Sequence, residues 1–160
     1  MHIRPLFETE YIAAARLIHD TVHTVCRNDY SPAELSAWAP ESFDMVRFHN
    51  ALTGCFNPAM FDGFRLVGFM SVEQDGYINR LFTHKDYQRR GIASALLAET
   101  EKWAKEKGLT SLRLDSSKTA CGFYLKHGFV EDGFSVMERN GIVFRNTVMK
   151  KTLLQQGDEK

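Results

Sequence analysis

Residues 86–97 have the sequence DYQRRGIASALL, a basic turn that runs directly into an apolar helix pattern. Gly91 and Ala93 are small, so the backbone can approach a ligand closely where the helix begins. The first turn of a helix carries unpaired N–H groups and a partial positive charge, to which Arg89 and Arg90 add full charges. The stretch therefore predicts a phosphate or pyrophosphate site, and the alternative is an ordinary helix start with solvated arginines.

Two familiar phosphate-binding loops are excluded by the letters of this turn. The chain contains no GxxxxGK[ST], so the loop is not that of a P-loop nucleotide-binding protein. It also lacks GxGxxG, which a dinucleotide-binding βαβ unit places after its first strand. Any anion site here must therefore belong to another class of loop.

The residues before the turn predict an antiparallel meander. Three segments rich in aromatic and β-branched residues, 56–61, 64–72 and 77–83, are separated by the dipeptides Asp62-Gly63 and Asp75-Gly76. Such dipeptides between apolar runs are typical of hairpin turns. We therefore expect three consecutive antiparallel strands.

The residues after the turn predict a crossover. A helical pattern over 89–107 ends at Gly108, a strand follows over 110–117, and a short helix over 118–128. Residues 129–153 predict two strands joined by a turn at Asn140-Gly141. A strand, a helix and another strand in succession imply one parallel pair within an otherwise antiparallel sheet.

The N-terminal third is predicted to be mainly helical. A short strand over 2–6 precedes a helical pattern over 9–26, and a third helix is expected over 41–54. Between them, Ser31, Pro32 and Glu34 form a capping box with proline at the first helical position. We expect one α/β domain over residues 1–152, with a mixed sheet and helices on both faces, and a polar tail over 153–160.

Composition narrows the class of protein. The chain has 160 residues, 44% of them hydrophobic and 25% charged, as in soluble globular proteins. Lys+Arg and Asp+Glu are 20 each, so no net charge attracts nucleic acid or an anionic membrane, and no apolar run is long enough to span one. Three cysteines without a CxxC, no signal-peptide pattern and no metal-ligand spacing predict a cytoplasmic protein without a bound metal.

Two linked motifs resemble the GNAT superfamily of N-acetyltransferases. The stretch QRRGIA (88–93) is similar to the acetyl-CoA motif Q/R-x-x-G-x-G/A, and ACGFYLKHGF (120–129) follows at the family's distance. The segment NDYSPAELSAWAP (28–40) also looks like a subgroup of small bacterial members with poorly defined substrates. The resemblance implies a mostly antiparallel sheet in which a central parallel strand pair splays apart to admit the pantetheine arm of CoA.

The resemblance also assigns positions for acetyl-CoA, as co-substrate. Main-chain groups of Leu81, Phe82 and Thr83 would pair with the pantetheine, and an N–H near Phe82 would polarise the thioester carbonyl. The pyrophosphate would lie on the N–H groups of Arg89, Arg90, Gly91, Ile92, Ala93 and Ser94. Ser117 stands where the family often has an asparagine that contacts CoA, so a shorter donor is expected there.

Tyr124 is the expected general acid. In the family this tyrosine lies near the CoA sulfur and protonates the leaving thiolate. The competing interpretation is a tyrosine of the hydrophobic core on an amphipathic helix. We therefore expect Tyr124 to be catalytic because of its place within GFYLKHGF rather than because of its residue type.

The general base is less well defined by the sequence. Many family members use a glutamate on the strands that face the acceptor, and Glu73 is the candidate here. Its position near a hairpin turn also suits a solvated residue at the edge of a strand. Asn79, on the next strand, cannot accept a proton in that role.

The function implied is transfer of an acetyl group from acetyl-CoA to a primary amine by direct attack, in a monomer or homodimer. A small-molecule amine such as an antibiotic, a polyamine or an amino-acid derivative is the leading acceptor, and nucleic acid is not expected. Two alternatives stay open: acetylation of a protein or peptide, and a module that binds acetyl-CoA without turning it over.

Overall fold

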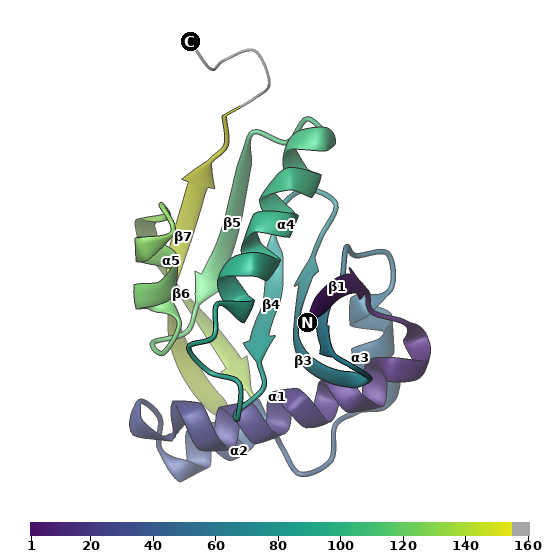
Figure 1. Cartoon of the computed structure of the whole chain (residues 1–160). Helices are drawn as coiled ribbons and strands as arrows, with labels where there is room; N and C mark the ends of the chain where they lie inside the picture. Colours follow the sequence, from purple (N-terminus) through teal and green to yellow (C-terminus); the bar gives the residue numbers. More distant parts are fainter. Residues whose placement is uncertain (155–160) are drawn as a thin grey trace.

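The computed structural model describes residues 1–154, so most of the predicted polar tail lies outside the described residues. The strands and helices occur in the predicted order (Figure 1). The elements are β1 (His2–Pro5), η1 (Glu8–Glu10), α1 (Tyr11–Val25), η2 (Cys26–Asn28), α2 (Pro32–Trp38), α3 (Met45–Leu52), β2 (Pro58–Asp62), β3 (Arg65–Val72), β4 (Ile78–Thr83), α4 (Ile92–Glu106), β5 (Ser111–Ser116), α5 (Cys121–Lys126), β6 (Val130–Arg139) and β7 (Ile142–Thr152).

The strands form two antiparallel groups that meet at one point. One group has the order β1-β2-β3-β4, and the other has the order β5-β7-β6. The two groups are joined by a single parallel bridge between Tyr77 and Arg113, where the N–H of Arg113 donates to the carbonyl of Gly76 over 3.1 Å. The named strands β4 and β5 have no ladder between them, so the edge of β4 beyond this bridge is left unpaired.

A bulge in β4 lies next to this junction. In the register with β3, Arg80 is opposite Ser71 and Ile78 is opposite Val72, which leaves Asn79 as the extra residue on β4. An extra residue bends its strand and increases the local twist. The bulge therefore lies where β4 and β5 part.

Two hydrophobic cores lie on the two faces of the sheet. Helices α1, α2 and α3 bury residues such as Ile18, Leu35 and Phe48 against one face. Helices α4 and α5 bury residues such as Leu96 and Tyr124 against the other. Figure 1 shows α4 lying along the sheet between α5 and β1, with α1 crossing at the opposite end from the C-terminus.

Two predicted helix boundaries differ from the structure. The helix predicted over 89–107 begins at Ile92, because Arg89 (φ 61°) and Gly91 (φ 77°) adopt left-handed conformations outside a helix. The helix predicted over 41–54 begins at Met45, because the Asp44 side chain accepts from the N–H of Arg47 and caps it there. Capping residues fix a helix start more sharply than hydrophobic periodicity does.

Among residues 1–154, no helix combines the length and the hydropathy that crossing a membrane requires.

Candidate functional site

The turn before α4 leaves its backbone donors unused by the protein. The start of α4 has no side-chain cap, whereas α2 is capped by Ser31 and α3 by Asp44. The uncapped N–H groups of the first helical turn belong to Ile92, Ala93 and Ser94. A helix start with free donors is complementary to an anion.

The conformation of this turn explains its glycine. Gly91 has φ 77°, a region that residues with a Cβ seldom occupy, and no atom lies within 4 Å of where its Cβ would be. Arg89 adopts φ 61° without being glycine. Such conformations cost about 1–3 kcal/mol each and are concentrated at functional sites.

Two side chains of the turn itself hold it against the sheet. Gln88 Nε2 donates to the carbonyl oxygens of Thr83 at 2.8 Å and His84 at 3.2 Å. The hydroxyl of buried Tyr87 donates to Asp62 over 2.8 Å, and Arg90 lies over the Tyr87 ring at 4.7 Å. The turn is therefore fixed before any ligand arrives.

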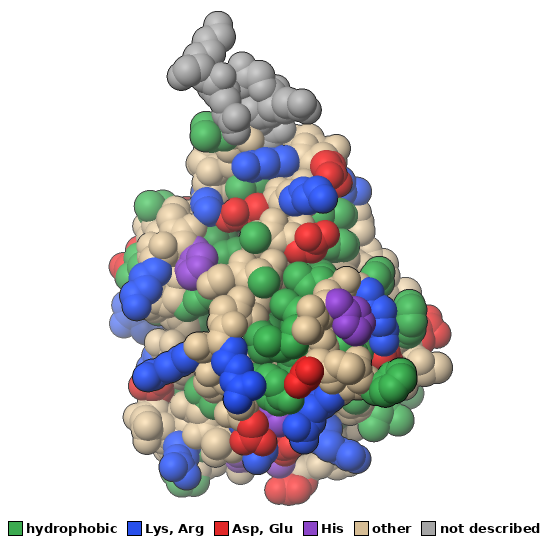
Figure 2. Space-filling view, in the orientation of Figure 1, with side chains coloured by type: hydrophobic (Ala, Val, Ile, Leu, Met, Phe, Trp, Pro, Cys, Tyr) green, Lys and Arg blue, Asp and Glu red, His purple; other side chains and the backbone are tan. Residues whose placement is uncertain are grey.

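A cavity of about 240 Å³ opens between this turn and α5. The cavity is lined by Thr83, Tyr87, Gln88, Arg89, Gly91, Ile92, Ala93, Ser94 and Phe123. Figure 2 shows basic side chains over the segment that leads into the lower end of α4. Of the residues predicted to contact pyrophosphate, the structure places Arg89 and residues 91–94 in the wall of this cavity, whereas Arg90 does not line it and lies over the Tyr87 ring.

The open edge of β4 offers main-chain groups to the same region, but not those of Phe82. The N–H of His84 donates to the carbonyl of Val67, so that pair is a hydrogen-bonded one. Because such pairs alternate along an antiparallel ladder, Phe82 is also bonded to its partner Phe69, and Leu81 and Thr83 direct their groups to the open edge. Of the three residues predicted to pair with the pantetheine, the register therefore leaves Leu81 and Thr83 on the open edge and excludes Phe82, and the N–H expected near Phe82 is that of Leu81 or Thr83.

Tyr124 lies on α5 in the core shared with α4 and does not line the cavity, although its neighbour Phe123 does. It is 3% exposed, and its ring packs edge-on against Phe123 and Phe129. Burial raises its pKa, so the phenol stays protonated through the neutral range. Within residues 1–154 its hydroxyl makes no hydrogen bond, which leaves the proton available to a ligand.

Ser94 and His127 join the start of α4 to the end of α5. His127 Nδ1 lies 2.8 Å from the carbonyl oxygen of Phe123, and its Nε2 lies 2.9 Å from Ser94 Oγ. Because a carbonyl oxygen only accepts, Nδ1 must carry the proton, and in the neutral ring Nε2 accepts from the Ser94 hydroxyl. This pair holds together the two helices that flank the cavity.

Ser117 directly follows β5, on the other side of the gap between β4 and β5. Its hydroxyl oxygen accepts from the N–H of Ala120 over 3.2 Å, and it keeps its own proton to donate. The neighbouring N–H of Lys118 donates to the hydroxyl of Tyr30 over 2.8 Å. Ser117 is therefore placed by a structured loop, and no contact of Ser117 reaches the residues of the turn.

Aromatic side chains cover the opposite face of β4. Half-buried Trp38 packs against Tyr30 at 5.3 Å and Phe82 at 6.3 Å between ring centroids. Tyr30 in turn contacts Phe144 of β7. The sequence does not predict the contact of Trp38 with Phe82, because the two residues are far apart in the chain.

Glu73 does not lie with the other predicted residues. It is exposed in the β3–β4 turn, and its N–H donates to the carbonyl of Tyr77. Tyr77 is five residues before Phe82, which corresponds to roughly 15 Å along a strand. The structure thus supports the solvated interpretation of Glu73.

Asp115 is the carboxylate that sequence reasoning missed. It lies on β5, two residues beyond the bridging Arg113, and accepts hydrogen bonds from the hydroxyls of Tyr77 and Ser135. Its position on the strand that parts from β4 brings it closer to the open edge than Glu73 is. No local pattern in the sequence marks it.

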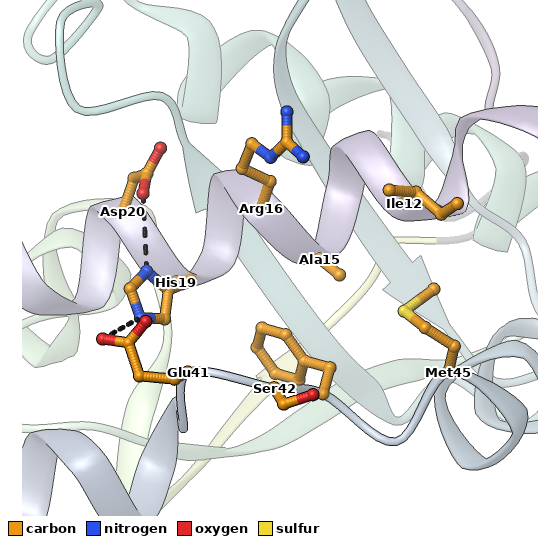
Figure 3. Close-up of a pocket in the computed structure, with 9 residues that line it drawn as sticks. Ile12, Ala15, Arg16, His19, Asp20, Glu41, Ser42 and Met45 are labelled. Carbon is orange, nitrogen blue, oxygen red and sulfur yellow. Dashed lines mark hydrogen bonds and ion pairs between the residues drawn. The ribbon is translucent and has the colours of Figure 1, made fainter.

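A larger groove of about 400 Å³ lies on the solvent side of α1 (Figure 3). There His19 points between Asp20 and Glu41, at 3.4 Å and 3.7 Å from their carboxylates. The opposite side of α1 is the buried one and includes Thr21, whose hydroxyl donates to the carbonyl of Thr83. The helix therefore separates this groove from β4.

Neither the cysteines nor a metal site adds chemistry within residues 1–154. Cys26, Cys55 and Cys121 are free thiols, and burial raises the pKa of Cys26 and Cys121, so neither is an activated nucleophile. No three His, Cys, Asp or Glu side chains of this part of the chain gather closely enough to hold a metal ion.

Comparison with known proteins gives consistent results. A family model described as an acetyltransferase (GNAT) domain matches residues 26–153. The uncharacterized N-acetyltransferase YafP of Escherichia coli K12 is 35% identical over 121 residues, which cover 76% of this chain and 75% of that protein.

Solved structures show the same fold. A GCN5-related N-acetyltransferase from Rhodopseudomonas palustris, described as "Aminotransferase, Class-II", superposes with a TM-score of 0.91 at 28% identity over 95% of both chains. PaiA N-acetyltransferase from Thermoplasma acidophilum, in complex with coenzyme A, has a TM-score of 0.74 at 22% identity over 94% of this chain and 98% of that chain. At this identity the second likeness concerns the fold alone.

Proposed function

This chain belongs to the GNAT family of acyl-CoA-dependent acetyltransferases, and we propose that it transfers an acetyl group from acetyl-CoA to a primary amine of a small molecule. The observation that carries the proposal is the uncapped turn at residues 89–94 beside the unpaired edge of β4. Acetyl-CoA has an anionic pyrophosphate at one end, which the free N–H groups of the turn complement. At the other end its thioester is attached to an arm with two amides, which the unpaired main-chain groups of β4 complement.

Acetyl-CoA supplies the thioester, and this chain supplies the contacts and the protons. The N–H groups of residues 89–94 hold the pyrophosphate, and the main-chain groups of Leu81 and the N–H of Thr83 pair with the pantetheine arm, because the Thr83 carbonyl already accepts from Gln88 and Thr21. One of these two N–H groups donates to the carbonyl oxygen as negative charge develops there. The acceptor nitrogen then bonds to the carbonyl carbon while the carbon–sulfur bond breaks.

Two protons must move for the reaction to balance. The amine loses one proton, and we propose that Asp115, rather than Glu73, accepts it through a water molecule. The expelled thiolate gains one from Tyr124. A tyrosine of raised pKa is a weak acid, but the same apolar surroundings also raise the pKa of the thiol, so the two groups stay matched.

The experiment that tests the proposal is thiol release from acetyl-CoA with a panel of small amines, with peptides and with no acceptor. Amine-dependent release with a new acetamide in the products supports it. Release that requires a peptide or protein favours the macromolecular alternative. CoA binding without release, in the presence of every amine tested, favours the non-catalytic module.

A further inference from the structure

Three arginines on the acceptor side lack an acidic partner. Arg80 lies on β4, Arg139 at the end of β6 and Arg47 on α3, and within residues 1–154 none of them is in an ion pair. Asp44 accepts from the backbone N–H of Arg47, not from its guanidinium. Asp115, an acid of β5, accepts hydrogen bonds from Tyr77 and Ser135 and forms no ion pair with these arginines in the described part of the chain. Arg80 is half-buried and Arg139 and Arg47 are exposed, so an anion from solvent can reach all three guanidinium groups.

Arg139 is close enough to act on Arg80, and Arg47 is close enough to act on Arg139. Burial, and then the positive charge of Arg139, lowers the pKa of Arg80. Burial, and then the charge of Arg47, lowers that of Arg139. Each shift disfavours the charged form that an arginine keeps at neutral pH, so the protein tolerates a repulsion here that an anion would relieve.

The cluster is held in place beside the reacting part of β4. The Arg80 guanidinium carbon lies 5.3 Å from the centre of the Phe48 ring of α3. Beyond the bulge at Asn79, Arg80 and Phe82 are two residues apart on β4 and share a face, about 7 Å from each other along the strand. Phe82 is also the residue that Trp38 contacts on this face.

Arg139 reaches the same face from the β6–β7 hairpin. Ser135 bonds to Asp115, so Met137 and Arg139, which follow it at intervals of two, point to the same side. Arg139 Nε lies 3.1 Å from Met137 Sδ, and the next residue, Asn140, donates to the carbonyl of Ala37 over 2.8 Å. The hairpin end is thereby anchored to α2, which fixes the position of Arg139.

We propose that the amine acceptor carries a carboxylate, which Arg139, Arg80 and Arg47 bind while the amino group faces the open edge of β4. The substrate class is thus an amino acid or a similar amino carboxylate, and this inference rests on the acetyltransferase function proposed above. Guanidinium groups match a carboxylate in a planar, two-point geometry. Polyamines and polycationic antibiotics are disfavoured because their charges are repelled by the cluster.

The test compares amino acids with their carboxamides, which differ only in the charged group. Binding of alanine, phenylalanine, lysine and glutamate, and of their amides, to the CoA-loaded protein is measured by calorimetry, so that turnover is not required. Acetylation of the same compounds and of spermidine is measured by thiol release. The variants are Arg139→Gln and the matched control Arg145→Gln, an exposed arginine of the same hairpin that lies over Phe134 on the opposite face.

We expect at least one free acid to bind tenfold or more tightly than its amide, as charge-assisted hydrogen bonds allow. Arg139→Gln should remove that preference, Arg145→Gln should keep it, and CoA affinity should stay the same in both. Equal binding of acids and amides, absence of binding by every acid, or preferred acetylation of spermidine overturns the inference. Acid binding that depends on Arg139 without acetylation of any amine supports the carboxylate site and refutes the proposed function.

Discussion

The turn at residues 83–94 and the acceptor face of β4 are built from the chain in different ways. The turn is one continuous segment, held by its own Gln88 and Tyr87. The acceptor face is assembled from α2, α3, β4, β5 and the β6–β7 hairpin, and its main contacts join residues such as Asn140 and Ala37 that are 103 positions apart. We propose that the first arrangement binds acetyl-CoA and that the second determines which acceptor binds.

The largest expected effect is on CoA binding by the turn at residues 83–94. Gly91→Asp should reduce CoA binding by a hundredfold or more, because it places a carboxylate against the pyrophosphate and like charges in contact cost several kcal/mol. Calorimetric titration with CoA measures the loss. The fold should survive, since no atom lies within 4 Å of the new Cβ.

The matched control is Gly63→Asp, which makes the same change at another open glycine of positive φ (60°), in the β2–β3 hairpin. Its CoA affinity should equal that of the wild type. Unchanged affinity in Gly91→Asp would exclude residues 89–94 as the pyrophosphate site.

The hydroxyl of Tyr124, on α5, is the next test. Tyr124→Phe should lower kcat by about a hundredfold, the usual contribution of a positioned proton donor. CoA affinity should stay similar, because the turn and the strand edge supply that binding. Steady-state kinetics on the best acceptor and calorimetry with CoA separate the two quantities.

The pH profile gives a second readout for Tyr124. Since burial raises its pKa, wild-type kcat should stay level through neutral pH and fall only well above pH 10, when the phenol ionises. This alkaline limb should be absent from the Phe variant. A variant with the kcat of the wild type contradicts the role of Tyr124 as general acid.

Sequence predicted the continuous region well and the assembled region poorly, for physical reasons. The meander and the turn depend on short-range signals, namely Asp-Gly dipeptides and a small, basic helix start, so Gly91 and its neighbours could be identified directly. The true start of α4 at Ile92 depends on a left-handed Arg89, which hydrophobic periodicity does not report. Which amides face the gap between β4 and β5 depends on register, and this is why Phe82 was predicted to contact the pantetheine together with Leu81 and Thr83.

The residues of the acceptor face could not be predicted from short-range sequence patterns. Asp115 has no flanking pattern, and its hydroxyl partners Tyr77 and Ser135 come from two other strands. Glu73 was a candidate because the family resemblance implies a glutamate on the strands that face the acceptor, and the structure places it exposed in the β3–β4 turn, as the alternative interpretation of a solvated residue predicted. Tertiary contacts of this kind arise from sheet order, which a single sequence specifies only indirectly.

Two substitutions can show whether Asp115 or Glu73 accepts the proton of the amine. Asp115→Asn should lower kcat with the best amine by about tenfold to a hundredfold, because it removes the proposed proton acceptor while keeping the shape of the side chain. Glu73→Gln, the matched removal of one acidic charge, should change kcat by less than about twofold. Rates at several pH values, with CoA affinity as the folding control, decide between the two carboxylates, and the reverse ranking would return the role to Glu73.

The smallest expected effect concerns how firmly the turn is held to α5. Ser94→Ala removes the hydroxyl that bonds to His127 Nε2 over 2.9 Å, leaving the N–H of residue 94 in the helix start. One such hydrogen bond is worth about 1 kcal/mol, so CoA should bind about fivefold more weakly and the backbone donors should still function. The control is Ser36→Ala on the exposed side of α2, which should leave CoA affinity unchanged. Calorimetry with CoA resolves a difference of this size. If Ser94→Ala binds CoA as the wild type does, the α4–α5 link plays no part in shaping the cavity, whereas a loss as large as that of Gly91→Asp would mean that the Ser94 hydroxyl itself contacts the pyrophosphate.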